Sequence, residues 1–304
     1  MASSPSPVLK QPVKLACVQL AAGPDKTANL LHAADKVREA ASAGAKIVVL
    51  PECFNSPYGC DHFPSYAETL LPSPPTPEQS PSFHALAAMA RDNNIYLIGG
   101  SIPELSTSPE EKDKKTYYNT SLTFSPTGHL LATHRKIHLF DISIPDRITF
   151  RESDVLSPGN ALTLIDLPDY GRLAVAICYD VRFPELATIA ARKGAFALIY
   201  PGAFNLTTGP LHWRLLGQAR AVDNQCYVAL CSPARDMSAG YHAWGHSLVV
   251  DPMAEVLVEA GEEEGIVYAD LEGAKIEEAR KWIPLGGQRR FDVYPDVSEG
   301  FGDL

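Results

Sequence analysis

The sequence predicts an α/β protein in which two similar units pack face to face as a four-layer α-β-β-α sandwich. Short apolar runs typical of strands alternate with stretches of helical periodicity. The two halves of the chain also repeat the same order of segments. Because helices would cover only one face of each sheet, the other apolar face must be buried, and pairing two units buries both.

The strand-like runs are short and rich in Val, Ile, Leu and Tyr. They are 13–20, 46–51, 95–100, 117–124, 129–134, 172–178, 196–201, 226–231, 246–250 and 265–270. Helical periodicity covers 25–43, 81–93, 182–193 and 210–224. "FSPTGHLL" (124–131) has the proline and glycine spacing of a tight turn.

The internal repeat rests on paired segments in a shared order. "LACVQL" (15–20) resembles "LAVAIC" (173–178), and "GAKIVVLPECFN" (44–55) resembles "GAFALIYPGAFN" (194–205). Each similarity is weak, and chance likeness between apolar strands is the alternative. The shared order favours a duplicated unit.

Composition narrows the class of protein. The 304 residues are 45% hydrophobic and 20% charged, as in a packed globule, and no apolar run is long enough for a membrane span. The net charge of −10 argues against nucleic acid and anionic membranes as partners. An anionic substrate would therefore need a local cationic group.

We divide the chain into a disordered Ser/Pro-rich arm (1–12), one domain (13–295) and a carboxyl-terminal tail (296–304). The arm lacks the features of a signal or transit peptide. The six cysteines are few and lie in strand-like contexts, which favours free thiols over a disulfide framework. We expect a cytoplasmic protein, with entry into mitochondria left open.

Cys178 stands out among the cysteines. It ends the apolar run "LAVAICYD" (173–180), and a Pro-containing segment that opens a helix follows. A sharp strand-to-helix turn would expose its sulfur and aim the backbone N–H of Tyr179 at a bound carbonyl oxygen. Inert packing is the alternative, and we assign it to Cys17, Cys226 and Cys231.

A cysteine that hydrolyses an amide needs a proton acceptor, and Glu52 is a candidate. It follows an apolar strand in "VVLPECFN", so partial burial would raise its pKa, although a solvated carboxylate is the alternative. Lys136, in "HRKIHLFD", could place an ammonium beside Cys178, favouring the thiolate and then an oxyanion. The alternative is that Lys136 is solvated, as most lysines are.

The histidine pairs His134/His138 and His242/His246 do not predict a metal site. Outside a helix, the i,i+4 spacing does not bring side chains together. A zinc site needs three or four converging ligands, so we expect no metal. A Cys-His hydrolase remains an alternative.

"LPECFNSPY", "HRKIHLFD" and "ICYDVRFPEL" together resemble the catalytic segments of the nitrilase superfamily of carbon–nitrogen hydrolases. The resemblance covers roughly 13–295. "IPDRITFRESDVLSPG", "YPGAFNLTTGPLHW" and "SPARDMSAGYHAWGHS" resemble its omega-amidase branch. That branch hydrolyses the terminal amide of 2-oxoglutaramate and 2-oxosuccinamate to the dicarboxylate and ammonia.

The resemblance implies a Glu-Lys-Cys triad with Cys178 as nucleophile, Glu52 as general base and acid, and Lys136 as oxyanion stabiliser. It also implies that Glu152, otherwise readable as a surface residue, positions Lys136 or the amide nitrogen. A thioester intermediate, no cofactor, the α-β-β-α fold and a homodimer are implied too. The dimer would form through the helices 182–193 and 210–224 and the segment 288–294.

Three further residues are candidates for binding the substrate. Arg182 could bind its carboxylate bidentately, or form a salt bridge with Asp180 or Glu185. Thr208 would present its hydroxyl and free N–H groups at a helix start, or merely cap that helix. Tyr58 would contact substrate from the pocket rim, formed by the Pro-rich segment 53–82.

Other functions remain open at the level of sequence. Another member of the superfamily, an N-carbamoyl amide hydrolase or a nitrilase, would share the triad. A catalytically idle interaction module would keep the fold, although the intact triad argues against it. The physiological monoamide is not determined by the sequence.

Overall fold

The computed structural model describes residues 7–107 and 115–300. One sheet has seven strands, in the order β15-β1-β2-β3-β5-β4 with β6 paired to β5. Their bounds are β1 Val13–Gln19, β2 Ile47–Val49, β3 Tyr96–Ile98, β4 Ile102–Thr107, β5 Lys115–Phe124, β6 Leu130–Arg135 and β15 Gly265–Leu271.

The other large sheet has six strands, in the order β14-β13-β12-β11-β10-β9. Their bounds are β9 Thr163–Leu167, β10 Gly171–Val175, β11 Ala195–Pro201, β12 Tyr227–Cys231, β13 Leu248–Val250 and β14 Val256–Glu259. A separate hairpin is formed by β7 Asp141–Ile144 and β8 Ile148–Arg151.

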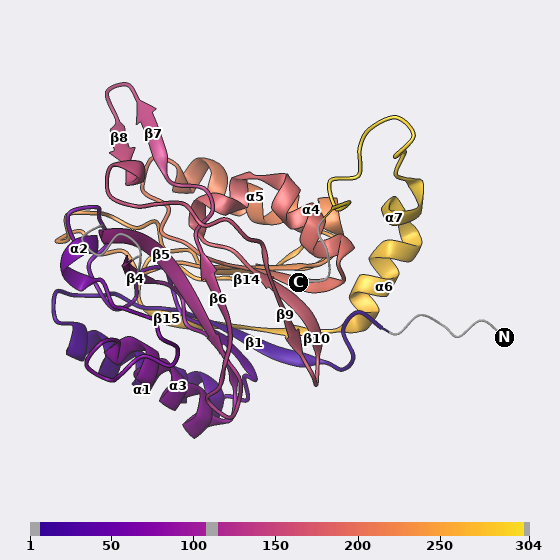
Figure 1. Ribbon diagram of the computed structural model, residues 1–304. Coiled ribbons are helices and arrows are strands. Elements are labelled where there is room, and N and C mark those ends of the chain that lie inside the picture. The colour runs from indigo at the N-terminus through magenta and orange to yellow at the C-terminus, as the bar shows by residue number, and fades with distance from the viewer. Residues whose placement is uncertain (1–6, 108–114, 301–304) are drawn as a thin grey trace.

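The predicted four-layer sandwich is confirmed (Figure 1). Helices α1 Lys26–Ser42 and α3 Pro81–Asn93 cover the first sheet, whereas α4 Pro184–Arg192 and α5 Gly209–Asn224 cover the second. The side chains of Asp25 and Ser80 cap the amino-terminal ends of α1 and α3, respectively, by accepting backbone N–H groups. Three further α-helices lie in the described residues: α2 Phe63–Tyr66, α6 Gly273–Trp282 and α7 Leu285–Gln288.

Alternating side chains build the layers. On β1, Leu15 and Cys17 belong to the core between the sheets, whereas Ala16 and Val18 pack toward the helices. Val175 and Ile199 bring the second sheet into the same central core. Burial of both faces explains why these strands appear in the sequence as continuous apolar runs.

The predicted repeat appears in the sheet topology. In each sheet three neighbouring strands, β1-β2-β3 and β10-β11-β12, run parallel, and the next strand, β5 or β13, runs antiparallel. The predicted tight turn is also present, since Gly128 N donates to Ser125 O at 2.9 Å. The two halves therefore share connectivity as well as segment order.

The predicted amino-terminal arm differs from the structure where it is described. Leu9 is buried in the central core, and its backbone bridges Gly171. Lys10 N donates to Tyr170 O at 2.9 Å. Residues 8–10 are thus packed, because the apolar side chain of Leu9 is buried beside the start of β10. Residues 1–6 of the predicted arm lie outside the described residues.

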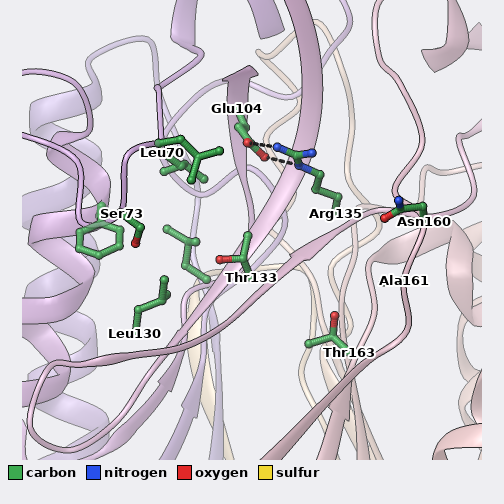
Figure 2. A pocket seen from close by; sticks show the side chains of 12 residues that line it. Leu70, Ser73, Glu104, Leu130, Thr133, Arg135, Asn160, Ala161 and Thr163 are labelled. Carbon is green, nitrogen blue, oxygen red and sulfur yellow. Dashed lines mark hydrogen bonds and ion pairs between the residues drawn. The ribbon is translucent and has the colours of Figure 1, made fainter. Parts of the chain in front are cut away.

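A pocket of about 280 Å³ lies beside β6 and is separate from the predicted site residues. Figure 2 shows its apolar wall near Leu70 and Leu130 and the ion pair of Glu104 with Arg135. The next residue after Arg135 is Lys136, so the end of β6 separates this pocket from the predicted active site. In residues 7–107 and 115–300, every helix is too short or too polar to cross a bilayer.

Candidate active site

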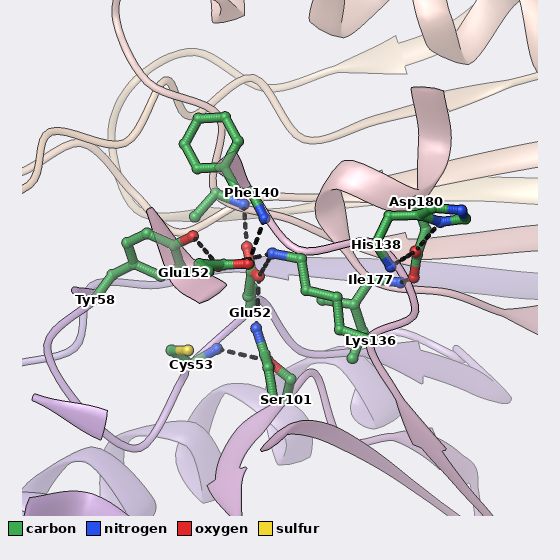
Figure 3. A network of polar contacts seen from close by, with 12 residues as sticks. Glu52, Cys53, Tyr58, Ser101, Lys136, His138, Phe140, Glu152, Ile177 and Asp180 are labelled. Carbon is green, nitrogen blue, oxygen red and sulfur yellow. Dashed lines mark hydrogen bonds and ion pairs between the residues drawn. The ribbon is translucent and has the colours of Figure 1, made fainter. Parts of the chain in front are cut away.

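The structure brings the four residues predicted to be catalytic into one buried cluster. Figure 3 shows three of them, Glu52, Lys136 and Glu152. Glu52 follows β2, and Lys136 follows β6 directly. Glu152 begins a 3₁₀ turn after β8, and Cys178 begins another three residues after β10 ends at Val175. The predicted strand 172–178 is therefore shorter, and Cys178 lies beyond it.

Lys136 is the centre of the cluster. Its Nζ lies 2.8 Å from Oε1 of Glu152 and 3.2 Å from Oε1 of Glu52, and all three side chains are excluded from solvent. Burial lowers the pKa of Lys136, but the two carboxylates outweigh burial and raise it well above its ordinary value. Lys136 is therefore a permanent cation inside the site.

Glu52 is held from several directions. Asn119 Nδ2 donates to Oε1 at 2.8 Å, and the backbone N–H of Ala203 donates to Oε2 at 2.7 Å. The neighbouring Cys178 side chain acts to lower the pKa of Glu52. Burial raises the pKa of Glu52, and the charge of Lys136 opposes this only in part. The direction matches the prediction, although burial is nearly complete rather than partial.

Local backbone contacts keep the Glu52 segment in place. Cys53 N donates to Ser101 Oγ at 3.0 Å, and Ser101 N donates to Pro51 O at 3.3 Å. Gly100 has a φ of 59°, and a Cβ there would lie 2.0 Å from Pro51 O. Only glycine allows this close approach between the segment after β3 and the segment after β2.

Glu152 is fixed by donors other than Lys136. Phe140 N donates to Oε2 at 2.7 Å, and the hydroxyl of Tyr58 donates to Oε1 at 3.0 Å. Glu152 is fully buried, which excludes the surface alternative. Tyr58, predicted at the pocket rim, is therefore a hydrogen-bonding partner of Glu152, and burial raises its pKa well above the ordinary value.

Cys178 occupies a strained backbone position. Its φ is 49°, in the left-handed region that non-glycine residues rarely adopt, which fits the predicted sharp turn. The chain must also come close to Gly202, where a Cβ would lie 3.0 Å from Cys178 Cα. Tyr179 is second in this turn, so its N–H is among the donors that have no partner within the helix.

The sulfur differs from the prediction in two respects. Cys178 is only 2% exposed, because its turn is covered by neighbouring segments. Burial raises its pKa well above the ordinary value, and Glu52 raises it further, while Lys136 acts in the opposite direction. The predicted cation, Lys136, is present, but it does not lower the pKa of Cys178 enough to make the resting side chain a thiolate. The site holds a thiol next to a carboxylate.

Asp180 organises the turn around Cys178. Its carboxylate accepts Ile177 N at 2.9 Å and His138 N at 2.8 Å. Burial raises the pKa of Asp180, but hydrogen bonds from His134 and His138 outweigh it, and the pKa is lowered. Asp180 therefore ties the segment carrying Lys136 to the turn carrying Cys178.

The two histidines converge, contrary to expectation. His138 Nδ1 lies 2.8 Å and His134 Nε2 lies 3.4 Å from the oxygens of Asp180. The i,i+4 argument assumed a regular path, but β6 ends at Arg135 and the chain then turns. Among the described residues no group of His, Cys, Asp and Glu is arranged to hold a metal ion.

Arg182 has no carboxylate partner among the described residues. The alternative salt bridge with Asp180 or Glu185 is not formed in the described residues, and Asp180 instead contacts His134 and His138. Instead Nη1 lies 3.2 Å from His212 Nδ1, and the guanidinium lies over the ring of Phe204 at 4.8 Å. Burial lowers the pKa of Arg182, and the Cys178 sulfur is within electrostatic range.

Thr208 does not present the donors that its sequence context predicted. It precedes α5, but its N–H and its hydroxyl both donate to Asn205 Oδ1, at 2.9 and 3.2 Å. Gly209 N donates to Asn205 O at 2.7 Å. Asn205 therefore satisfies the start of α5, and in this structure Thr208 does not cap the helix with its own side chain.

Several residues of the site were missed at the level of sequence. Asn119 lies within β5, where nothing in the local pattern marks it, and it reaches Glu52 only through the fold. Tyr241 packs on Tyr58 with ring centroids 4.4 Å apart and donates its hydroxyl to Ala203 O at 2.5 Å. Asp180, two residues after Cys178, was the one available signal, and it was read only as a partner for Arg182.

A family model for carbon-nitrogen hydrolases matches residues 14–281. The chain belongs to the carbon-nitrogen hydrolase family. Among solved structures, Nit3 of Saccharomyces cerevisiae, described as a member of branch 10 of the nitrilase superfamily, superposes with a TM-score of 0.84 at 50% identity, covering 95% of this chain and 100% of that one.

Curated relatives carry the name omega-amidase. Omega-amidase NIT3 of Saccharomyces cerevisiae is 52% identical over 97% of this chain and 99% of its own length. Omega-amidase NIT2 of Homo sapiens is 53% identical over 92% and 96% respectively. A nitrilase-superfamily relationship is thus established over nearly the whole chain.

Proposed function

We propose that the chain is an omega-amidase, which hydrolyses the terminal amide of small dicarboxylate monoamides such as 2-oxoglutaramate and 2-oxosuccinamate. The identity of more than half the residues with curated omega-amidases supports this substrate class. The geometric observation that supports the chemistry is a buried Lys136 between the carboxylates of Glu52 and Glu152. Glu52 is also close enough to Cys178 to raise its pKa.

The first half-reaction forms a thioester. Glu52 in its ionised form takes the proton of the Cys178 thiol while the sulfur attacks the amide carbon. The oxyanion that develops on the carbonyl oxygen is stabilised by Lys136 and by the N–H of Tyr179. Glu52 then passes its proton to the leaving nitrogen, the carbon–nitrogen bond breaks, and ammonia departs.

The second half-reaction regenerates the enzyme. Water attacks the thioester carbon while Glu52 takes one of its protons, and the carbon–sulfur bond breaks. The sulfur recovers that proton from Glu52. The raised pKa of Glu52 suits a group that accepts and donates a proton near neutral pH. These steps use only groups of this chain and water.

Arg182 is our candidate for binding the distal carboxylate of the substrate. It is partly buried and has no ionised partner among residues 7–107 and 115–300, although it lies near the sulfur. In a protein of net charge −10, such a cation is what an anionic substrate requires. The position of Thr208 offers less support for a binding role, because Asn205 occupies its donors.

The proposed activity is tested by following ammonia release from 2-oxoglutaramate with wild type and Cys178→Ala. We expect turnover by wild type only, and a covalent adduct at Cys178 after rapid quenching. N-Carbamoyl-β-alanine and an aliphatic nitrile serve as competing substrates, and preference for either would contradict the substrate assignment. A folded wild type that turns over none of the three would favour an idle module.

We also propose a homodimer that forms through α5. Leu211 and Leu215 on this helix are 58% and 61% exposed, which is unusual for leucines on one helical face. Leu215→Glu should convert a dimer to a monomer in sedimentation equilibrium. Leu31→Glu on α1, where the leucine is 65% exposed, is the matched control and should leave the dimer intact. Monomeric wild type would contradict the proposal.

We place the protein in the cytoplasm. All six cysteines are free thiols, which suits a reducing compartment. Fractionation with antibodies against the native protein would test this location, and recovery mainly with mitochondria would contradict it.

A further inference from the structure

The turn that begins at Cys178 ends at Arg182, and different partners hold its two ends. The carboxylate of Asp180 accepts Ile177 N at 2.9 Å and so fixes the end that carries the nucleophile. At the other end, the backbone carbonyl of Val181 directly precedes Arg182. The partner of that carbonyl therefore determines how the backbone of Arg182 is held.

Pro184 cannot supply a backbone donor to the carbonyl of Val181. A 3₁₀ helix joins each carbonyl to the N–H three residues later, and for Val181 that residue is Pro184, which has no N–H. Val181 is fully buried, so its carbonyl needs a partner within the protein. The side chain of Arg220 is that partner, because its Nε donates to Val181 O at 2.9 Å.

Arg220 reaches the turn from α5. Its side chain is only 8% exposed, and its Nη1 forms an ion pair with Asp223 Oδ2 at 3.0 Å. Asp223 is half exposed and balances the charge of the guanidinium from the solvent side. Burying a guanidinium costs free energy unless its charge is paired and its donors are used. Here the ion pair and the hydrogen bond to Val181 use donors on opposite sides of the group.

A second contact from α5 holds the side chain of Arg182 itself. Nη1 of Arg182 donates to Nδ1 of His212 at 3.2 Å. Burial and the charge of Arg182 lower the pKa of His212, so the ring is neutral at pH 7 and can accept. His212 and Arg220 are about two turns apart, which places them on the same side of the helix. α5 therefore holds both the side chain of Arg182 and the peptide before it.

We propose that Arg220 is a positioning residue for substrate selection, which fixes the peptide before Arg182 and so directs that guanidinium at the distal carboxylate of the substrate. The inference rests on the proposed amidase function. Without this anchor the guanidinium would sample several orientations and lose part of a bidentate contact. The nucleophile would stay in place, because Asp180 holds its end of the turn separately. Arg220 thus affects anionic amides selectively, through Arg182 rather than by contact.

Arg220→Lys tests the proposal in the full-length enzyme. Lysine has a methylene group where arginine has Nε, so this variant loses the donor to Val181 and keeps a cation for Asp223. We expect kcat/KM for 2-oxoglutaramate to fall roughly 3- to 10-fold, mainly through KM, which is the effect of one hydrogen bond. The kcat/KM for butyramide, which has no carboxylate, should stay within twofold.

Arg220→Gln is the reciprocal variant. The side-chain nitrogen of glutamine occupies the position of Nε in arginine, so the donor to Val181 is kept while the ion pair with Asp223 is lost. The preference for 2-oxoglutaramate over butyramide should remain within twofold of wild type. Arg214→Lys is the matched control, because Arg214 lies on the same helix but is 59% exposed and pairs with Glu259. Both substrates should be unaffected in this control.

A double variant tests whether Arg220 acts through Arg182. In an Arg182→Met background, Arg220→Lys should cause no further loss with 2-oxoglutaramate, because the residue that it positions is gone. Calorimetric titration with 2-oxoglutarate measures positioning without catalysis. In Cys178→Ala enzyme, Arg220→Lys should raise the Kd for this dicarboxylate roughly 3- to 10-fold. Each variant is measured below its own unfolding transition, followed by circular dichroism.

Equal losses for 2-oxoglutaramate and butyramide in Arg220→Lys would overturn the proposal, because Arg220 would then support the whole turn. Unchanged kcat/KM and Kd would overturn it as well, and so would a full further loss in the Arg182→Met background. Wild type that hydrolyses neither amide would refute the amidase function. The titration would then decide the role of Arg220 separately: binding that Arg220→Lys weakens supports it, and no binding overturns it.

Discussion

The ammonium of Lys136 lies 2.8 Å from Oε1 of Glu152, and neither side chain is exposed to solvent. A buried ion pair is seldom retained for stability alone, because desolvation offsets much of the attraction. Here the same ammonium also lies 3.2 Å from Glu52. Glu152 therefore holds a cation beside the proposed general base and close to where the oxyanion would form.

Lys136→Met should lower kcat/KM for 2-oxoglutaramate by about 10²–10³-fold, since an oxyanion donor is lost. It should also destabilise the protein by about 3–5 kcal/mol at neutral pH, because two buried carboxylates lose their cation. Ammonia release and urea unfolding measure the two effects. Lys14→Met, which breaks an exposed pair with Asp270, is the control and should change stability by less than about 1 kcal/mol. A stable, active Lys136→Met would contradict both roles.

The pH dependence of wild-type kcat/KM should show an acid limb above about pH 4.3, the usual pKa of Glu. Glu52 must be ionised to take the thiol proton, and burial raises its pKa. Activity therefore rises with pH through this titration. No basic limb should appear below about pH 9, because burial holds Cys178 above its ordinary pKa.

Glu152→Gln should move that acid limb to lower pH. The negative charge of Glu152 is one of the causes that raise the pKa of Glu52, and the amide keeps a hydrogen-bond acceptor for Tyr58. Because Glu52 and its charged neighbours titrate together, the apparent pKa of the limb is a property of the whole cluster. The direction in which this apparent pKa moves is therefore the quantity to measure. A limb that stays in place or moves upward would show that Glu152 does not act on Glu52 electrostatically.

Asp180→Asn should destabilise the protein by about 3 kcal/mol at pH 7, since a buried acceptor of several N–H groups becomes neutral. The pKa of Asp180 is lowered in the folded state, so its contribution is present above the unfolded pKa of about 3.9. It is lost as the pH falls through the folded value. The difference in unfolding free energy from wild type should therefore persist at pH 5 and shrink only below about pH 4. Equal stability at pH 7 would contradict this role.

Arg182→Met should raise KM for 2-oxoglutaramate, and its effect should depend on the substrate charge. Loss of one charge-assisted contact corresponds to roughly 10- to 100-fold in kcat/KM, from about 1.5–3 kcal/mol. A neutral amide such as butyramide should lose little. Equal losses for both substrates would mean that Arg182 supports the turn at Cys178 rather than the distal carboxylate.

Much of the fold was predictable because the hydrophobic periodicity of each segment and the order of the segments can be read directly from the sequence. The missed elements are those whose signals conflict or are short. Pro103 lies inside β4 and argues against a strand, but β4 is the last strand in the order of its sheet, where proline is tolerated. The β7–β8 hairpin has four residues in each strand, too few for a clear alternation. Leu9 was assigned to the arm because its neighbours are polar and Pro-rich, but its side chain is buried in the central core and its backbone bridges Gly171.

The site was predictable only where the chain marks it. Cys178 and Glu52 follow apolar strands, which distinguishes them from solvated residues of the same type. Asn119 carries no such mark, since its amide meets Glu52 through the pairing of distant strands. The resting state of Cys178 depended on burial, which a motif does not reveal. Thr208 was misjudged because Asn205, three residues earlier, takes its donors.

The hydrogen bond from Ala203 to Glu52 joins the two halves of the molecule, as does the contact of Glu52 with Cys178. The proposed base and the proposed nucleophile thus follow strands of different sheets, and neither half alone contains both residues. Slight separation of the sheets would abolish activity while leaving helices and strands intact. On heating, loss of activity should therefore precede the loss of the circular dichroism signal. Activity would then measure whether the two halves remain packed together.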